Sequence, residues 1–293
     1  MNEIYTKLKH IFMRGNLLVK FIYINVGIFV AIRLVIVVLT LFGLKDIHFL
    51  EYLQMPSSPA LLLYRPWTPV TYMFLHVNML HILFNMLWLY WFGGLFLRFF
   101  SERQLGGVYV SGGIVGAVFF LTAYNLFPYF RHMENLGLLE GASASVMAIV
   151  FAVSFFRKDY EINLLFVGRV KLIYLALLTL VIDLLSVVST NAGGHIAHLG
   201  GAMFGILFAE QLQKGKDFTI LVNRLIDGIA NLRKRKQPRM KVTRRRPETD
   251  MEYNARKRAE TVRMDAILDK LKYSGYDSLS ADEKRDLFEA SKR

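Results

Sequence analysis

The chain has 293 residues, 54% of them hydrophobic, and a formal net charge of +13. Most of this charge lies from Lys214 onward, where 22 Lys and Arg stand against 13 Asp and Glu. The absence of cysteine excludes disulfides, thiolate catalysis and metal sites built on cysteine. We therefore expect an apolar body embedded in a membrane and a basic tail in water.

Six apolar segments are predicted to be membrane-spanning helices, because a helix needs about 20 residues to cross the hydrocarbon layer. They follow a basic N-terminal segment, residues 1–20, and we see no small-residue cleavage site, so we interpret the first segment as an uncleaved span. The expected spans are 21–44, 69–97, 105–127, 142–156, 171–190 and 194–213. The predicted fold class is an all-α membrane protein, with a six-helix membrane domain over 21–213 and a basic helical tail over 214–293.

The positions of Lys and Arg predict the orientation of these spans. Basic residues gather in the N-terminal segment, in the segments after the second and fourth spans, and in the tail. Since loops rich in Lys and Arg stay in the cytoplasm, both termini are expected there.

The fourth expected span is too short for a full crossing. Residues 142–156 would extend about 22 Å at ~1.5 Å per residue, against ~30 Å of hydrocarbon. Arg157 and Lys158 should hold its C-terminal end at the inner surface. Ser143, at its other end, is therefore predicted to lie below the outer surface and to face a pocket that admits water.

Polar residues on three spans suggest a catalytic site. A serine hydroxyl needs a neighbouring base, and histidine is the usual one, so Ser143 is the candidate nucleophile and His198 the candidate base. Gly201 and Gly205 share a helix face with His198, and this face predicts a close crossing with the small residues of the fourth span.

A second polar pair could stabilise the negative charge that develops on a carbonyl oxygen during acyl transfer. His81 and Asn85 are four residues apart and so share one helix face. Together with the backbone N–H of Ser143, they are the predicted oxyanion donors.

Three runs of the sequence together resemble the rhomboid family of intramembrane serine proteases: His76-Val-Asn-Met-Leu-His81-Ile-Leu-Phe-Asn85, Gly141-Ala-Ser143-Ala and Ala197-His198-Leu-Gly-Gly201-Ala-Met-Phe-Gly205. The resemblance covers roughly residues 20–213. It implies a six-helix bundle in which Ser143 and His198 form a catalytic dyad and Asn85 and His81 hold the oxyanion. It also implies transmembrane protein substrates, no cofactor or metal, and a bacterial inner (plasma) membrane location. The chain departs from the family pattern at three places. Ala144 replaces a glycine, Met147 replaces an aromatic residue that supports the histidine, and Trp67-Thr68 stands in the first outer loop where the family often has a Trp-Arg pair.

Each of these assignments has an alternative. Ser143 could be only a helix N-cap, and Ser145 is the competing serine. His195 competes with His198 as the base, and the two could instead bind metal or haem. His81 and Asn85 could serve only as interhelical hydrogen-bond partners. Asp183 could orient a histidine or gate the fifth span, although a plain interhelical hydrogen bond is the simpler interpretation.

The tail is predicted to contain short helices. Residues 218–232 have an apolar face, made of Phe218, Leu221, Leu225, Ile229 and Leu232, and end in a basic run; contact with anionic lipid on the inner surface is expected. A second basic run, 244–246, precedes a helical pattern over 259–272 and a capping-box pattern at 280–283. The stretch 275–280 resembles a small module found on some bacterial rhomboids. No nucleic-acid partner is expected, because acidic residues are interspersed with the basic ones.

The leading hypothesis is an intramembrane protease. The alternative is a catalytically inactive rhomboid-like protein that binds or escorts membrane clients.

Overall fold

The computed structural model describes residues 6, 12, 14–44, 48–76, 78–131, 137–164, 168–233 and 248–291. The described residues fall into two compact units, 1–233 and 234–293, each treated separately below. Most of the predicted basic N-terminal segment lies outside the described residues. So do the two basic runs of the tail, apart from the backbone of Arg233.

Among the described residues of the first unit, four helices are long and apolar enough to cross a membrane: α2 (Leu17–Leu41), α5 (Met79–Phe96), α6 (Glu102–Leu126) and α10 (Ala192–Gln213). Two further apolar helices are shorter, α8 (Ser143–Phe156) and α9 (Leu172–Leu185). These six helices correspond to the six predicted segments. Their number as membrane crossings remains a prediction.

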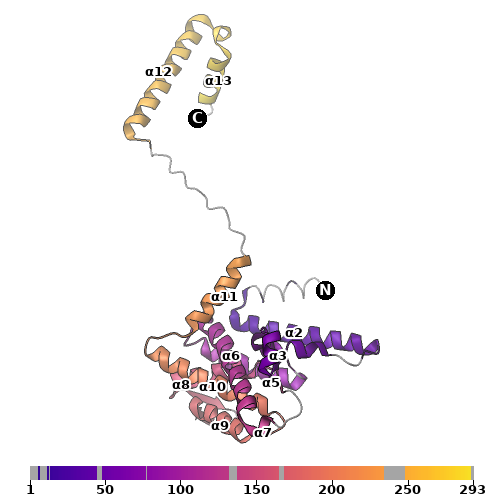
Figure 1. Cartoon of the computed structure of the whole chain (residues 1–293). Helices are drawn as coiled ribbons and strands as arrows, with labels where there is room; N and C mark the ends of the chain where they lie inside the picture. Colours follow the sequence, from indigo (N-terminus) through magenta and orange to yellow (C-terminus); the bar gives the residue numbers. More distant parts are fainter. Residues whose placement is uncertain are drawn as a thin grey trace. The chain divides into compact units, whose positions relative to one another are not determined.

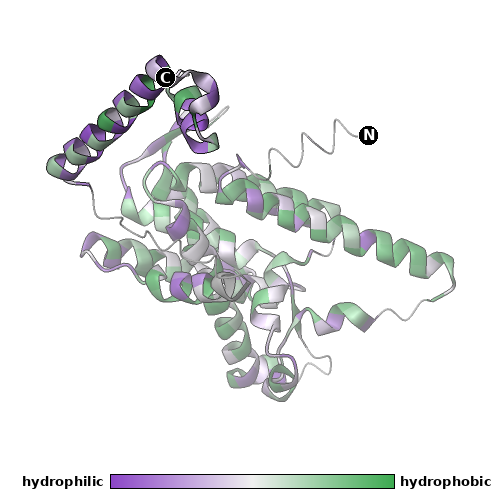
Figure 2. Ribbon diagram, turned by 90° about the horizontal axis from the view of Figure 1, so that it is seen from above, coloured by the Kyte–Doolittle hydropathy of each residue, from purple (hydrophilic) through white to green (hydrophobic). Residues whose placement is uncertain are grey.

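Helix α8 packs against α5, α6, α9 and α10, and these helices form one bundle (Figure 1). Its residues from Ala144 to Ser154 are all buried. Helix α2 is different: only 11% of its most apolar window is buried, and apolar residues lie along its whole length (Figure 2). Such an exposed apolar helix requires a lipid or protein environment.

The expected span 69–97 is wrong at its start. Instead of one helix there are α4 (Thr68–Thr71), the 3-10 helix η2 (Tyr72–Phe74), a short break and then α5. Asn78 begins α5 as its N-cap, because its side chain accepts a hydrogen bond of 2.9 Å from the backbone N–H of His81. Hydropathy does not predict this break, because the residues around it are as apolar as those of a membrane span.

The described part of the chain is mostly helical, as predicted, and short elements connect the helices. Strand β1 (Met55–Pro56) pairs with β2 (Leu138–Leu139), and β3 (Glu161–Leu164) pairs with β4 (Gly168–Lys171), both antiparallel. The remaining short elements are η1 (His48–Tyr52), α3 (Pro59–Tyr64) and α7 (Pro128–Arg131). These strand pairs satisfy backbone hydrogen-bonding groups of the loops.

Helix α11 (Thr219–Arg233) packs against α6 and so belongs to the first unit. Thr219 is fully buried, next to Gly107, and Asp227 pairs with Arg103 at 2.9 Å. On the predicted apolar face, Leu221 and Leu225 are exposed.

The second unit contains α12 (Asp250–Ser274), the 3-10 helix η3 (Tyr276–Ser278) and α13 (Ala281–Ala290). The predicted capping box at Ser280 and Glu283 is present. Lys270 on α12 pairs with Glu283 at 2.9 Å, and Arg263 pairs with Asp286. Both helices are rich in hydrophilic residues (Figure 2), as expected for a unit in water.

Candidate active site

Ser143 is the first residue of α8 and lies two residues after a backbone conformation that requires glycine. Gly141 has φ +126°, which is favourable only for glycine, and its N–H donates to the carbonyl of Tyr72 at 2.9 Å. The N-cap of α8 is Ala142, so Ser143 is not the N-cap that the simpler interpretation proposed. Its half-buried side chain is therefore available for another role.

The predicted close crossing of α8 and α10 is observed. A Cβ added to Gly201 would clash with the carbonyl oxygen of Ala144, and one added to Gly205 would clash with that of Ala148. Helix α6 approaches from another side, where a Cβ on Gly116 would lie 2.7 Å from the Cβ of Ala144. Small residues thus allow three helices to meet directly behind Ser143.

Ser143 and His198 line the same cavity, which has a volume of about 470 Å³. Its walls come from α5, α8, α9 and α10, and include His81, Asn85 and Met147. Apolar side chains, such as Phe84 and Trp88, form much of the remainder. A cavity of this size, largely apolar with a few converging polar groups, is typical of a binding or active site.

The two predicted oxyanion donors lie on the α5 side of this cavity. If Gly141 carried a Cβ, that atom would lie 2.9 Å from Cε1 and 2.9 Å from Nε2 of His81, and 3.5 Å from Oγ of Ser143. The His81 ring and the Ser143 hydroxyl therefore both lie beside Gly141. The side-chain amide of Asn85 donates one hydrogen to the carbonyl of His81 at 2.9 Å. Since an amide nitrogen carries two hydrogens, the second remains to be donated elsewhere.

His195 and His198 are both bound to one carboxylate. The Nδ1 of each ring lies 2.8 Å from Oδ1 of Asp183 on α9. The Asp183 side chain is only 7% exposed, so these hydrogen bonds compensate for burying its charge. His198 lines the cavity with Ser143, whereas His195 is not among the residues that line it. This difference favours His198 as the partner of Ser143.

Two imidazoles and a carboxylate are also a common set of metal ligands, and their donor atoms lie within 4.8 Å of one another. However, the two contacts of 2.8 Å have the length of hydrogen bonds. Both Nδ1 atoms and Oδ1 of Asp183 are therefore hydrogen-bonded to one another.

The remaining predicted residues have less direct positions. Ser145 is 1% exposed and faces α6, where its Oγ is 2.7 Å from the position of a Cβ on Gly113. It therefore points away from the cavity. Met147 lines the cavity and is buried, which is compatible with a supporting role beside His198.

Glu140 and Trp88 are among the cavity residues that had no predicted role. Glu140 precedes Gly141 and accepts a hydrogen bond of 2.7 Å from Gln54; burial raises the pKa of its carboxyl. Trp88 lies on the face of α5 that carries Asn85, one turn away from it, and helical spacing could have identified it. His76 is buried, and its ring centroid lies 5.1 Å from that of His81.

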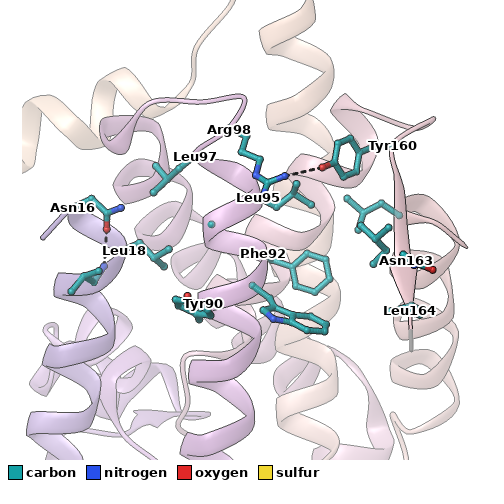
Figure 3. Close-up of a pocket in the computed structure, with 15 residues that line it drawn as sticks. Asn16, Leu18, Tyr90, Phe92, Leu95, Leu97, Arg98, Tyr160, Asn163 and Leu164 are labelled. Carbon is teal, nitrogen blue, oxygen red and sulfur yellow. Dashed lines mark hydrogen bonds between the residues drawn. The ribbon is translucent and has the colours of Figure 1, made fainter. Parts of the chain in front are cut away.

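A second cavity, of about 540 Å³, lies between the N-terminal end of α2, the C-terminal end of α5 and β3 (Figure 3). Apolar and aromatic side chains, including Phe92 and Leu95, form its wall. Arg98 donates to the hydroxyl of Tyr160 at 3.1 Å across its rim. Neither Ser143 nor His198 lines it, so it is separate from the candidate active site.

In chemical terms, the first cavity contains the groups that acyl transfer requires: a serine hydroxyl, an imidazole bound to a carboxylate, and amide and imidazole donors.

Known proteins share this part of the chain. Residues 64–214 match the rhomboid domain family, and residues 248–293 match DUF6576, a family of unknown function. The chain is 30% identical over 165 residues to rhomboid protease GlpG of Yersinia pseudotuberculosis, covering 56% of this chain and 54% of that protein. It is 28% identical over 159 residues to RHOMBOID-like protein 12, mitochondrial, of Arabidopsis thaliana, covering 51% of this chain and 47% of that protein.

The chain thus spans about half the length of the curated relatives that it matches. The matched region 64–214 includes α5, α6, α8, α9 and α10, which build the cavity and the glycine crossing behind it. Because that region covers more than half of the 293 residues, this chain belongs to the rhomboid family.

Proposed function

We propose that the protein is an intramembrane serine protease, which hydrolyses peptide bonds in or near transmembrane segments of other membrane proteins. The observation that carries this proposal is the single cavity lined by Ser143 and His198 between apolar helices. Family membership supports it, since one of the relatives is named a protease.

The first half of the reaction forms an acyl-enzyme. His198 takes the proton of the Ser143 hydroxyl on its Nε2, because its Nδ1 is bound to Asp183. The Ser143 oxygen attacks the carbonyl carbon of the scissile peptide bond, and the carbonyl oxygen becomes negatively charged. His198 then gives the proton to the departing amine as the carbon–nitrogen bond breaks.

The second half regenerates the enzyme. A water molecule loses a proton to His198 and attacks the ester carbon, and Ser143 leaves with that proton. In both halves the negative oxygen is held by the backbone N–H of Ser143, by the second amide hydrogen of Asn85 and by the imidazole of His81. Such donors contribute roughly 2.7–4 kcal/mol each in other serine proteases.

The proposed setting follows from the distribution of charge and apolar surface. We propose six membrane crossings, formed by α2, α5, α6, α8, α9 and α10, with both termini in the cytoplasm of a bacterial cell and the body in its inner membrane. The exposed Leu221 and Leu225 of α11 would contact lipid, with the adjoining basic run attracted to anionic headgroups. The tail after residue 213 would be water-exposed.

A catalytically inactive rhomboid-like protein that binds or escorts membrane clients is the second candidate. Met147 and Ala144, the two departures from the family pattern that lie closest to Ser143, favour it. The presence of both Ser143 and His198 in one cavity argues against it.

The test is cleavage of a transmembrane reporter substrate by reconstituted protein. Ser143→Ala should reduce cleavage below detection, because no other group supplies the nucleophile. Ser145→Ala is the matched control: this serine lies on the same helix but faces α6, and its loss should leave activity near that of the wild type. A Ser143→Ala protein that cleaves as fast as the wild type would contradict the proposal.

A further inference from the structure

The hydrogen bonds around Asp183 determine which nitrogen of each histidine carries a proton. An ionised carboxylate can only accept hydrogen bonds. Since Oδ1 of Asp183 is 2.8 Å from Nδ1 of both His195 and His198, both Nδ1 atoms must be the donors. In a neutral imidazole, the Nε2 of His198 then carries a lone pair, which is the form that a general base requires.

The same bonds also restrict the orientation of the His198 ring. Asp183 comes from α9, whereas His198 comes from α10, so the ring is tied to a second helix as well as to its own. His195, one turn earlier on α10, binds the same oxygen. With two donors on one oxygen, the carboxylate is held in place and the His198 ring is held with its Nε2 directed away from Asp183.

Charge is the third contribution. Taking the serine proton makes His198 positive in a cavity of low polarity, where a nearby negative charge has a large effect. Asp183 is the carboxylate in direct contact with this ring. The other ionisable groups around the cavity are His81 on α5 and Glu140 before α8, while His195 lies on α10 itself.

We propose that Asp183 is a positioning residue for His198, so that the dyad works as a group of three, Asp183, His198 and Ser143, with His195 helping to hold the carboxylate by binding the same oxygen. This inference rests on the proposed protease function. It also gives His195 a role other than that of a competing base.

Asp183→Asn is the direct test, because it removes the charge and keeps the size of the side chain. We expect kcat on the reporter substrate to fall by roughly 10²–10⁴-fold, with KM changed by less than about threefold, since Asp183 would act on the chemistry and not on substrate binding. Labelling of Ser143 by a fluorophosphonate probe should slow in parallel. His195→Ala should give a smaller loss of kcat, because the carboxylate keeps its bond to His198.

Asp159→Asn is the matched control. It removes the same charge from a side chain that is 93% exposed and paired with Lys171, and kcat should be unchanged. If Asp183→Asn keeps kcat within about twofold of wild type while Ser143→Ala is inactive, the role of Asp183 is refuted and the protease function stands. If Ser143→Ala is itself active, the proposed function fails first.

A spectroscopic measurement keeps the inference testable if Asp183→Asn does not fold. In wild-type protein labelled with ¹⁵N-histidine, the ring ¹⁵N chemical shifts of His198 report which ring nitrogen bears the hydrogen. These signals are assigned as the ones that disappear in His198→Ala. We expect the hydrogen on Nδ1 near neutral pH. A hydrogen found only on Nε2 would contradict the inference.

Discussion

Adding a single methyl group at Gly201 should impair catalysis without touching either dyad residue. A Cβ there would lie 2.9 Å from the carbonyl carbon of Ala144 and closer still to its oxygen. Comfortable contacts between carbon atoms are ~3.5–4.0 Å, so α8 and α10 must separate by roughly 0.5–1 Å. Ser143 lies one residue before Ala144, and His198 one helical turn before Gly201, so this separation acts directly on the distance between them.

The expected effect has two parts. Overpacking a tight helix crossing costs about 1–3 kcal/mol of stability. Misplacement of catalytic groups by about 1 Å costs roughly 10²-fold in rate. Gly201→Ala should therefore unfold at lower temperature in detergent and cleave the reporter substrate about 100-fold more slowly, measured at a temperature where it remains folded.

Gly27→Ala is the control for this experiment. Gly27 lies within α2, and a Cβ there would meet no atom within 4 Å. Alanine is a better helix former than glycine by about 1 kcal/mol, so this variant should be as active as the wild type and no less stable. A Gly201→Ala protein with the wild-type cleavage rate would refute the argument that the glycine face sets the geometry of the dyad.

Two further predictions concern local structure. Asn78→Ala removes the N-cap of α5 and should lower stability by about 1 kcal/mol, with a small loss of cleavage rate because α5 carries His81 and Asn85. Asn78→Asp keeps the capping oxygen and should restore the melting temperature. Equal melting temperatures of the Ala variant and the wild type would argue against the cap. In the second unit, hydrogen bonds from Lys270 and Ser280 lower the pKa of Glu283 to about 2, so the bonds between α12 and α13 should persist above pH 4.5, the ordinary value of this carboxyl, and be lost as the pH falls towards 2. The protection factors of the α13 amides, corrected for the intrinsic pH dependence of exchange, measure this, and Glu283→Gln should weaken their fall at low pH. Low protection that is already present at pH 6 would contradict it.

Some features of the site could be predicted because they depend on local spacing. Gly201 and Gly205 lie on the helix face of His198 whatever the rest of the fold does, and a face of small residues implies a close neighbour. The observed crossing with Ala144 and Ala148 agrees with that reasoning. The short fourth helix followed equally directly from counting apolar residues before Arg157.

Other features depend on contacts between distant segments. Sequence alone left three roles open for Asp183, namely orienting a histidine, gating the fifth span or making a plain interhelical hydrogen bond, because nothing in it shows that this residue faces both His195 and His198. The break before α5 was missed because hydropathy does not distinguish a buried loop from a helix, although Asn78 is a residue type that favours N-caps.

The contact of α11 with α6 was missed for a similar reason. It depends on Thr219 fitting against Gly107, two residues more than a hundred positions apart. No local sequence pattern in either segment predicts this contact, because neither residue is unusual at its position in its own helix.

The most direct test of the protease proposal is the site of covalent labelling by a fluorophosphonate, which reacts only with an activated serine. Wild-type protein in detergent is treated with the probe and the modified peptide is identified by mass spectrometry. We predict a single adduct on Ser143, which His198→Ala abolishes. Absence of an adduct on Ser143, or labelling that does not require His198, would contradict the account.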